Sequence, residues 1–180
     1  MDVEALIDDV IDREGGYSNH RADRGGATCW GITETVARAD GYTGAMRALP
    51  RARAQAIYRR LYWTAPNFDR VAARSPAVAA EMFDTGVNMG VAVAATFLQR
   101  TLNALNRGAS HYADVALDGR IGEATLTALD TFLDRRGRGS AAVLLKALEA
   151  LQGERYVVLA ERRPANEAFL YGWLANRIGA

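Results

Sequence analysis

Two carboxylic acids and a hydroxyl lie close together near the start of this sequence, at Glu14, Asp23 and Thr28. Cleavage of a glycosidic bond needs one protonated carboxyl at the leaving oxygen, and a second group that holds a water or attacks the sugar itself. Glu14 suits the first role and Asp23 the second, with Thr28 helping to fix the water. An alternative stays open for Asp23, because Asp followed by Arg-Gly-Gly is equally typical of a solvated turn.

The segment that ends at Glu14 has the pattern of an amphipathic helix capped by Asp2. Its apolar stripe consists of Val3, Leu6, Ile7, Val10 and Ile11. Glu14 continues this stripe, so we expect it to point inward. The carbonyls at the helix end and partial burial would then both favour the protonated form that a general acid needs. Gly15 and Gly16 are expected to supply a positive-φ exit. The alternative is a surface glutamate before an ordinary glycine cap.

Composition limits the class of protein. The chain has 180 residues, is 49% hydrophobic and carries a net charge of +1, which favours one packed core and gives no reason to expect nucleic acid as a partner. No segment could span a membrane. The acidic, amphipathic start "MDVEALIDDVID" is unlike a signal peptide. We therefore expect synthesis in the cytoplasm, and another route out if the substrate lies outside.

The rest of the chain has the pattern of helices joined by turns. Residues 18–33, rich in glycine and small polar residues, predict a loop or short irregular hairpin. No run alternates for long enough to build a sheet, so we predict an all-α fold with one long irregular active-site loop. Helices are expected at 54–62 (ended by Pro66), from Pro76 to 83, at 91–105, from 122 to 129, from a Ser140 cap to 159, and from Pro164 to 174.

The stretch "EGGYSNHRADRGGATCWGIT" resembles the signature of the glycoside hydrolase family 108 N-acetylmuramidases, the lysozyme-like endolysins of phages and prophages. The segments "FDTGVNMG", "LQRTLNAL", "LDGRIGEATLTAL" and "ERRPANEAFLYGWLANRIG" resemble the predicted peptidoglycan-binding region that usually follows in that family. We therefore expect a catalytic part at 1–75 and a peptidoglycan-binding-like part at 76–180, packed into one globule.

The resemblance implies a compact lysozyme-like helical fold and a peptidoglycan hydrolase without a cofactor. The bond cleaved would join N-acetylmuramic acid to N-acetylglucosamine. The catalytic acid of the family corresponds to Glu14. The order Glu, Asp, Thr also resembles the order of the catalytic residues in phage-type lysozymes, which assigns the other two roles to Asp23 and Thr28. Because a threonine beside a carboxylate suits the holding of a water, we expect inversion at the anomeric carbon. The protein would act as a monomer, in the periplasm or cell wall, after leaving the bacterial cytoplasm by a route other than a signal peptide.

Three further residues are candidates for contact with the glycan. Tyr17 and Trp30 flank the loop and could stack on sugar rings. Asn88 is a polar residue in an otherwise apolar helix, and its amide either satisfies a buried backbone group or lines the cleft.

Two other functions stay open. Cys29 could be the nucleophile of a peptidase or amidase with His20 or His111, although a lone cysteine is more often a small buried hydrophobic residue. His20 and His111 have no partner at helical spacing, so we predict no metal site. Alternatively, the protein could be a non-catalytic wall-binding or scaffold protein, in which only the C-terminal half carries the function.

Overall fold

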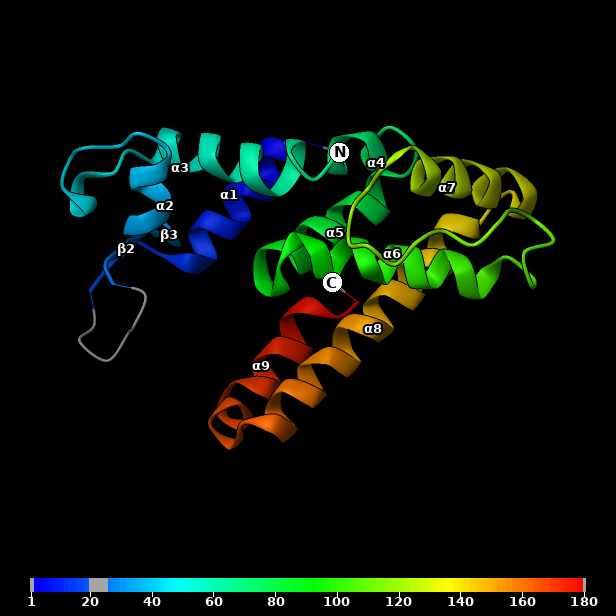
Figure 1. Cartoon of the computed structure of the whole chain (residues 1–180). Helices are drawn as coiled ribbons and strands as arrows, with labels where there is room; N and C mark the ends of the chain where they lie inside the picture. The colour runs from blue at the N-terminus through cyan, green and yellow to red at the C-terminus, as the bar shows by residue number, and fades with distance from the viewer. Residues whose placement is uncertain (1, 20–25, 180) are drawn as a thin grey trace. The chain divides into compact units, whose positions relative to one another are not determined.

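The computed structural model describes residues 2–19 and 26–179, which form two units, residues 1–65 and 66–180 (Figure 1). Helices dominate both units, so the predicted fold class is confirmed. Among the described residues, no helix is both long and apolar enough to cross a membrane.

The first unit combines helices with a small sheet. Its elements are α1 (Val3–Glu14), β1 (Tyr17–Ser18), β2 (Thr28–Cys29), β3 (Ile32–Thr33), α2 (Glu34–Ala39), the 3₁₀ turn η1 (Met46–Ala48), α3 (Arg51–Tyr58) and the π-helical continuation η2 (Arg59–Thr64). The three antiparallel strands follow the order β1-β2-β3. Each strand has two residues, which is too short for the alternating pattern by which a strand is recognised in sequence.

The first helix follows its sequence pattern closely. The backbone N–H of Glu4 donates to the Asp2 carboxylate at 2.9 Å, which confirms the predicted cap. Ile7, Val10 and Ile11 are buried on one face, and α1 packs against α3. The helix therefore anchors its last residue to the core of this unit.

The second unit is helical throughout its described part. Its elements are α4 (Phe68–Ala72), α5 (Pro76–Met89), α6 (Val91–Leu105), α7 (Glu123–Arg136), α8 (Ser140–Arg162), the 3₁₀ turn η3 (Pro164–Asn166) and α9 (Glu167–Arg177). Helix α5 packs against α4, α6 and α8, while α9 packs along α8 (Figure 1). The core consists of Phe68, Phe83, Leu98, Leu102, Leu126, Leu129, Phe132 and Leu144.

One predicted cap in this unit is wrong. Gly139 takes the N-cap position of α8 and gives it no side-chain hydrogen bond, whereas Ser140 is the first helical residue. The Ser140 hydroxyl instead donates to the carbonyl of Leu133, in the preceding helix, at 3.5 Å. The side chain turns away from its own backbone because the connection between α7 and α8 is short, and the end of α7 supplies an acceptor.

Candidate active site

The predicted acid Glu14 is the last residue of α1, and its side chain is exposed. The expectation that it points inward is therefore wrong. The buried face of the helix ends at Val10 and Ile11, and the last turn extends beyond the core. Gly15 has φ of 75°, as predicted for the helix exit, whereas the predicted positive φ of Gly16 is wrong; among the described residues, no atom lies within 4 Å of a Cβ at either glycine. The chain that follows the acid is thus not crowded by any described atom.

The stem of Glu14 rests on a tight turn between β2 and β3. Trp30 and Gly31 form this two-residue turn, with φ of 56° and 73°, between the paired residues Cys29 and Ile32. A Cβ at residue 31 would lie 2.9 Å from Glu14 Cγ and 3.0 Å from Glu14 Cβ. Only glycine leaves room for the acid at this distance.

Tyr58 also contacts the space beside Gly31, together with the stem of Glu14. Its side chain is only 3% exposed, and its hydroxyl donates to the carbonyl of Trp30 at 3.2 Å. A Cβ at Gly31 would overlap this hydroxyl. Burial raises the pKa of Tyr58 well above its usual value, and the charges of Glu14 and Tyr62 raise it further. The hydroxyl therefore stays a neutral donor beside the acid.

Trp30 holds an unusual backbone conformation for a large residue. Such strain costs about 1–3 kcal/mol and persists only where neighbours impose it. Its indole Nε1 donates to the carbonyl of Leu49 at 2.9 Å, and the Arg51 guanidinium lies 5.7 Å from its ring. Arg51 in turn pairs with Asp8 and Asp12 of α1. These contacts tie the turn to the helix that carries Glu14.

The small sheet carries two more of the predicted site residues. Thr28 is half-buried in β2, where it pairs with Ser18 of β1 and Thr33 of β3. Tyr17 in β1 is 41% exposed, and the Arg47 guanidinium lies 5.5 Å from its ring. Tyr17 is thus partly open to solvent, and its stacking on a sugar ring stays a prediction. Asp23, the predicted base, lies outside the described residues.

The cysteine is in an environment that opposes a nucleophilic role. Cys29 is 2% exposed, and burial raises the pKa of its thiol above the usual value, so little thiolate is present near neutral pH. His111 belongs to the second unit, where burial and then Arg136, Arg135 and Arg107 lower its pKa. His20 lies outside the described residues. In the part of the chain that the structure describes, no group of three or more His, Cys, Asp or Glu residues could hold a metal ion.

Asn88 lies in α5 of the second unit and is half-buried. Its amide nitrogen donates to the backbone carbonyl of Asp84 at 2.8 Å and to the carboxylate of Asp84 at 3.2 Å. That carboxylate also accepts from Gln152 and pairs with Arg177. The amide thus takes part in a local polar network, and its contact with glycan stays a prediction.

Gly31 and Tyr58 are the site residues that sequence reasoning missed. Tyr58 lies on a helical apolar stripe, so it has the pattern of a core residue, and it is buried. Gly31 follows Trp30 in "CWGIT", and a glycine between two strand-forming residues is a turn signal. That signal locates the turn but does not reveal that the turn contacts Glu14.

Two family models match successive parts of the chain. Residues 7–90 match the family described as Glycosyl hydrolase 108, and residues 93–178 match the family described as Predicted Peptidoglycan domain. The solved structure of Brucella abortus SagA is similar over 96% of this chain and 88% of that chain, with 25% identity and a TM-score of 0.66. No curated protein matches the chain. The family resemblance seen in the sequence is confirmed, while the division after residue 75 stays a prediction.

Proposed function

We propose that this chain, which belongs to the glycosyl hydrolase 108 family over residues 7–90, is an N-acetylmuramidase. Residues 93–178 belong to the peptidoglycan domain family, so the chain is a glycoside hydrolase that acts on peptidoglycan. It cleaves the bond between N-acetylmuramic acid and N-acetylglucosamine. The observation that supports this proposal best is the placement of Glu14, whose stem is held against Gly31 while the residue stays exposed to solvent.

In this proposal Glu14 is the general acid and gives its proton to the leaving oxygen. The carboxyl of the free protein is exposed, so a bound glycan strand must cover it and remove water. The rigid helix end and the turn beneath it keep the acid in one place while this happens.

The second half of the mechanism belongs to Asp23 and Thr28. Asp23 accepts a proton from a water on the opposite face of the sugar, and the Thr28 hydroxyl orients that water, since it can both donate and accept. The water attacks directly, so the anomeric carbon inverts, and the two carboxyls should be ~6.5–9.5 Å apart. Tyr17 and Trp30 stack on sugar rings. The enzyme works without a cofactor.

We also propose a biological setting for this activity. The enzyme acts as a monomer at the bacterial cell wall, where it lyses the wall as a phage or prophage endolysin. To test whether the protein acts as a monomer, its activity per molecule is measured over a dilution series. A monomer keeps the same activity per molecule at every concentration.

The experiment that tests the proposed function is a digest of purified peptidoglycan followed by analysis of the new ends. We expect a fall in turbidity and new reducing ends on muramic acid. NMR of product released in the first minutes should show the α-anomer, because inversion converts a β-linked strand to α. New amino groups would instead indicate a peptidase, and early β-anomer or a trapped glycosyl ester on Asp23 would contradict inversion.

Cys29→Ser is expected to keep most of the turnover of the parent enzyme, because Cys29 packs in the core. Its stability should fall, since a buried hydroxyl without a partner costs about 1–3 kcal/mol. Activity should be measured well below the melting temperature, with circular dichroism as the check on folding. Complete loss of activity at unchanged helicity would revive the peptidase hypothesis.

A further inference from the structure

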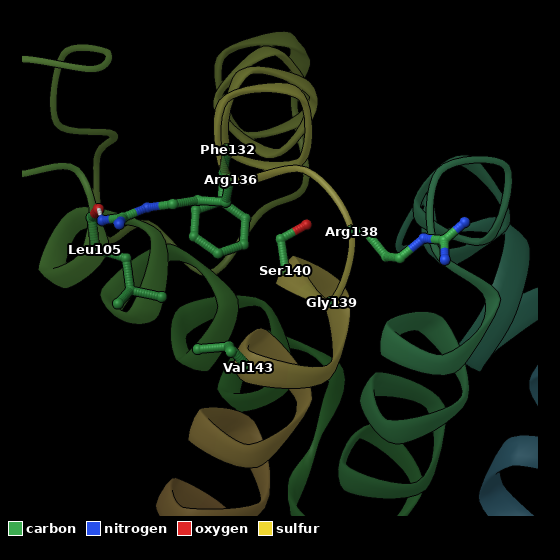
Figure 2. A pocket seen from close by; sticks show the side chains of 7 residues that line it. All are labelled: Leu105, Phe132, Arg136, Arg138, Gly139, Ser140 and Val143. Carbon is green, nitrogen blue, oxygen red and sulfur yellow. Dashed lines mark hydrogen bonds between the residues drawn. The ribbon is translucent and has the colours of Figure 1, made fainter.

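A cavity of about 390 Å³ lies where three helices of the second unit meet (Figure 2). Leu105 comes from the end of α6, Phe132 and Arg136 from α7, and Ser140 and Val143 from the start of α8. Arg138 and Gly139, in the connection between α7 and α8, complete the lining. The volume is within the range of small-molecule pockets, whose walls are mostly apolar with a few polar groups. The cavity lies entirely within the residues that match the peptidoglycan domain.

Arg136 gives the cavity a cation with free donors. Its Nη2 donates to the carbonyl of Leu105 at 3.1 Å, and its guanidinium extends along one side of the cavity toward Leu105 (Figure 2). A guanidinium has five N–H donors, so several remain for a ligand. Among the described residues, no acid forms an ion pair with Arg136, with Arg135 or Arg138 beside it in sequence, or with Arg107, which acts on His111 together with Arg136. The surroundings therefore carry an excess of positive charge that favours an anion.

The Ser140 hydroxyl, in the first turn of α8, is a second polar group in the lining. This side chain is 6% exposed, and its hydrogen bond to the carbonyl of Leu133 is at the 3.5 Å limit, so the hydroxyl can turn and donate to a ligand instead. The backbone N–H groups of Ala141 and Ala142, in the first turn of α8, bond to no described group. Between Arg136 and Ser140 the wall is formed by the apolar side chains of Leu105, Phe132 and Val143.

We propose that this cavity binds a carboxylate whose neighbouring carbon bears a methyl group. The carboxylate bonds to Arg136 and Ser140, and the methyl group packs against Leu105 and Val143. Peptidoglycan offers this chemistry in two places, the terminal D-alanine of its stem peptides and the lactyl group of muramic acid that has lost its peptide. The inference rests on the proposed function only in taking peptidoglycan as the source of the ligand.

Titration of the isotope-labelled full chain, followed by NMR, tests the inference. The ligands are N-acetyl-D-alanyl-D-alanine, the same dipeptide as its C-terminal amide, and N-acetylmuramic acid. We expect the acid dipeptide or N-acetylmuramic acid to shift the amide signals of Arg136, Ser140 and Val143, and to bind at least about tenfold more tightly than the amide. If N-acetyl-D-alanyl-D-alanine binds more tightly, the natural ligand is the stem peptide. If N-acetylmuramic acid binds more tightly, the natural ligand is the lactyl group of muramic acid.

Two variants locate the binding. Arg136→Gln removes the charge, and Val143→Trp fills the cavity at a position that is already 53% exposed, so that each should weaken binding at least about tenfold. Arg162→Gln, at the far end of α8, is the matched control and should bind like the parent. Equal binding of acid and amide, no binding of either acid, or unchanged binding by Arg136→Gln would overturn the inference.

These ligands contain no bond that a muramidase cleaves, so the two proposals fail separately. A protein that hydrolyses peptidoglycan but ignores both acids would overturn only the binding inference. A protein that binds an acid in this cavity but releases no muramic acid ends would overturn only the proposed function.

Discussion

Glu14→Gln is expected to lower the rate of peptidoglycan hydrolysis by at least ~10²-fold, because glutamine keeps the shape of the side chain but cannot donate the proton that the leaving oxygen needs. The side chain is exposed, and no described residue bonds to its carboxylate, so the variant should fold with unchanged stability. Binding to insoluble peptidoglycan should also be retained. Turbidity clearance, a pull-down on purified wall and thermal melting measure the three quantities.

Asp9→Asn is the matched control for this variant. Asp9 is an exposed acid on the same helix, and the side chain of Asp9 makes no ion pair with a described residue. The control loses the same charge at a distance from the turn at Gly31, so it should clear the wall at the parent rate. If Glu14→Gln does the same, Glu14 is not the general acid, and the mechanism must be abandoned.

Sequence patterns predicted the local structure around Glu14 well, because local physics determines it. The Asp2 cap, the buried stripe of α1 and the positive φ of Gly15 each depend on residues within a few positions. A cap is satisfied by a backbone N–H two positions on, and a glycine exit requires only the absence of a Cβ. These features therefore need no knowledge of the tertiary structure.

The orientation of Glu14 was predicted wrongly because it depends on where the core ends. Helical spacing places Glu14 in line with Ile7 and Val10, but spacing does not show how far along the stripe the neighbouring elements extend. The core covers Ile11 and stops short of the last turn. The acid is therefore open to solvent in the free protein, and in the proposed mechanism the bound glycan is what covers it.

The contacts beneath Glu14 could not be predicted because they join residues far apart in sequence. Tyr58 lies 28 residues from its acceptor Trp30, and the β2–β3 turn is too short to show strand periodicity. The left-handed conformation of Trp30 is an independent sign of a constrained site, because a large side chain adopts it only under the pressure of its surroundings. We infer that the strain at Trp30 is tolerated because the turn positions the acid.

Gly31→Ala is accordingly expected to have the second largest effect, although residue 31 takes no part in the chemistry. A Cβ there would overlap the Tyr58 hydroxyl and press on Glu14 Cγ from 2.9 Å, so the acid must move. A displacement of about 1 Å at a catalytic group can cost ~10²-fold in rate. The φ of 73° adds about 1–2 kcal/mol of backbone strain. Turnover on peptidoglycan and the melting temperature measure the two effects.

Gly41→Ala separates displacement of the acid from backbone strain, because Gly41 belongs to the same unit and has a similar φ of 80°. The nearest atom to a Cβ at Gly41, Arg53 Nη2, would be 3.7 Å away, which is an ordinary contact. This variant should lose similar stability yet keep its turnover. Adding Tyr58→Phe to Gly31→Ala removes the closest obstacle, so stability should partly recover while turnover stays low, since Glu14 is still displaced. Equal turnover in the Gly31→Ala and Gly41→Ala variants would show that the turn does not position the acid.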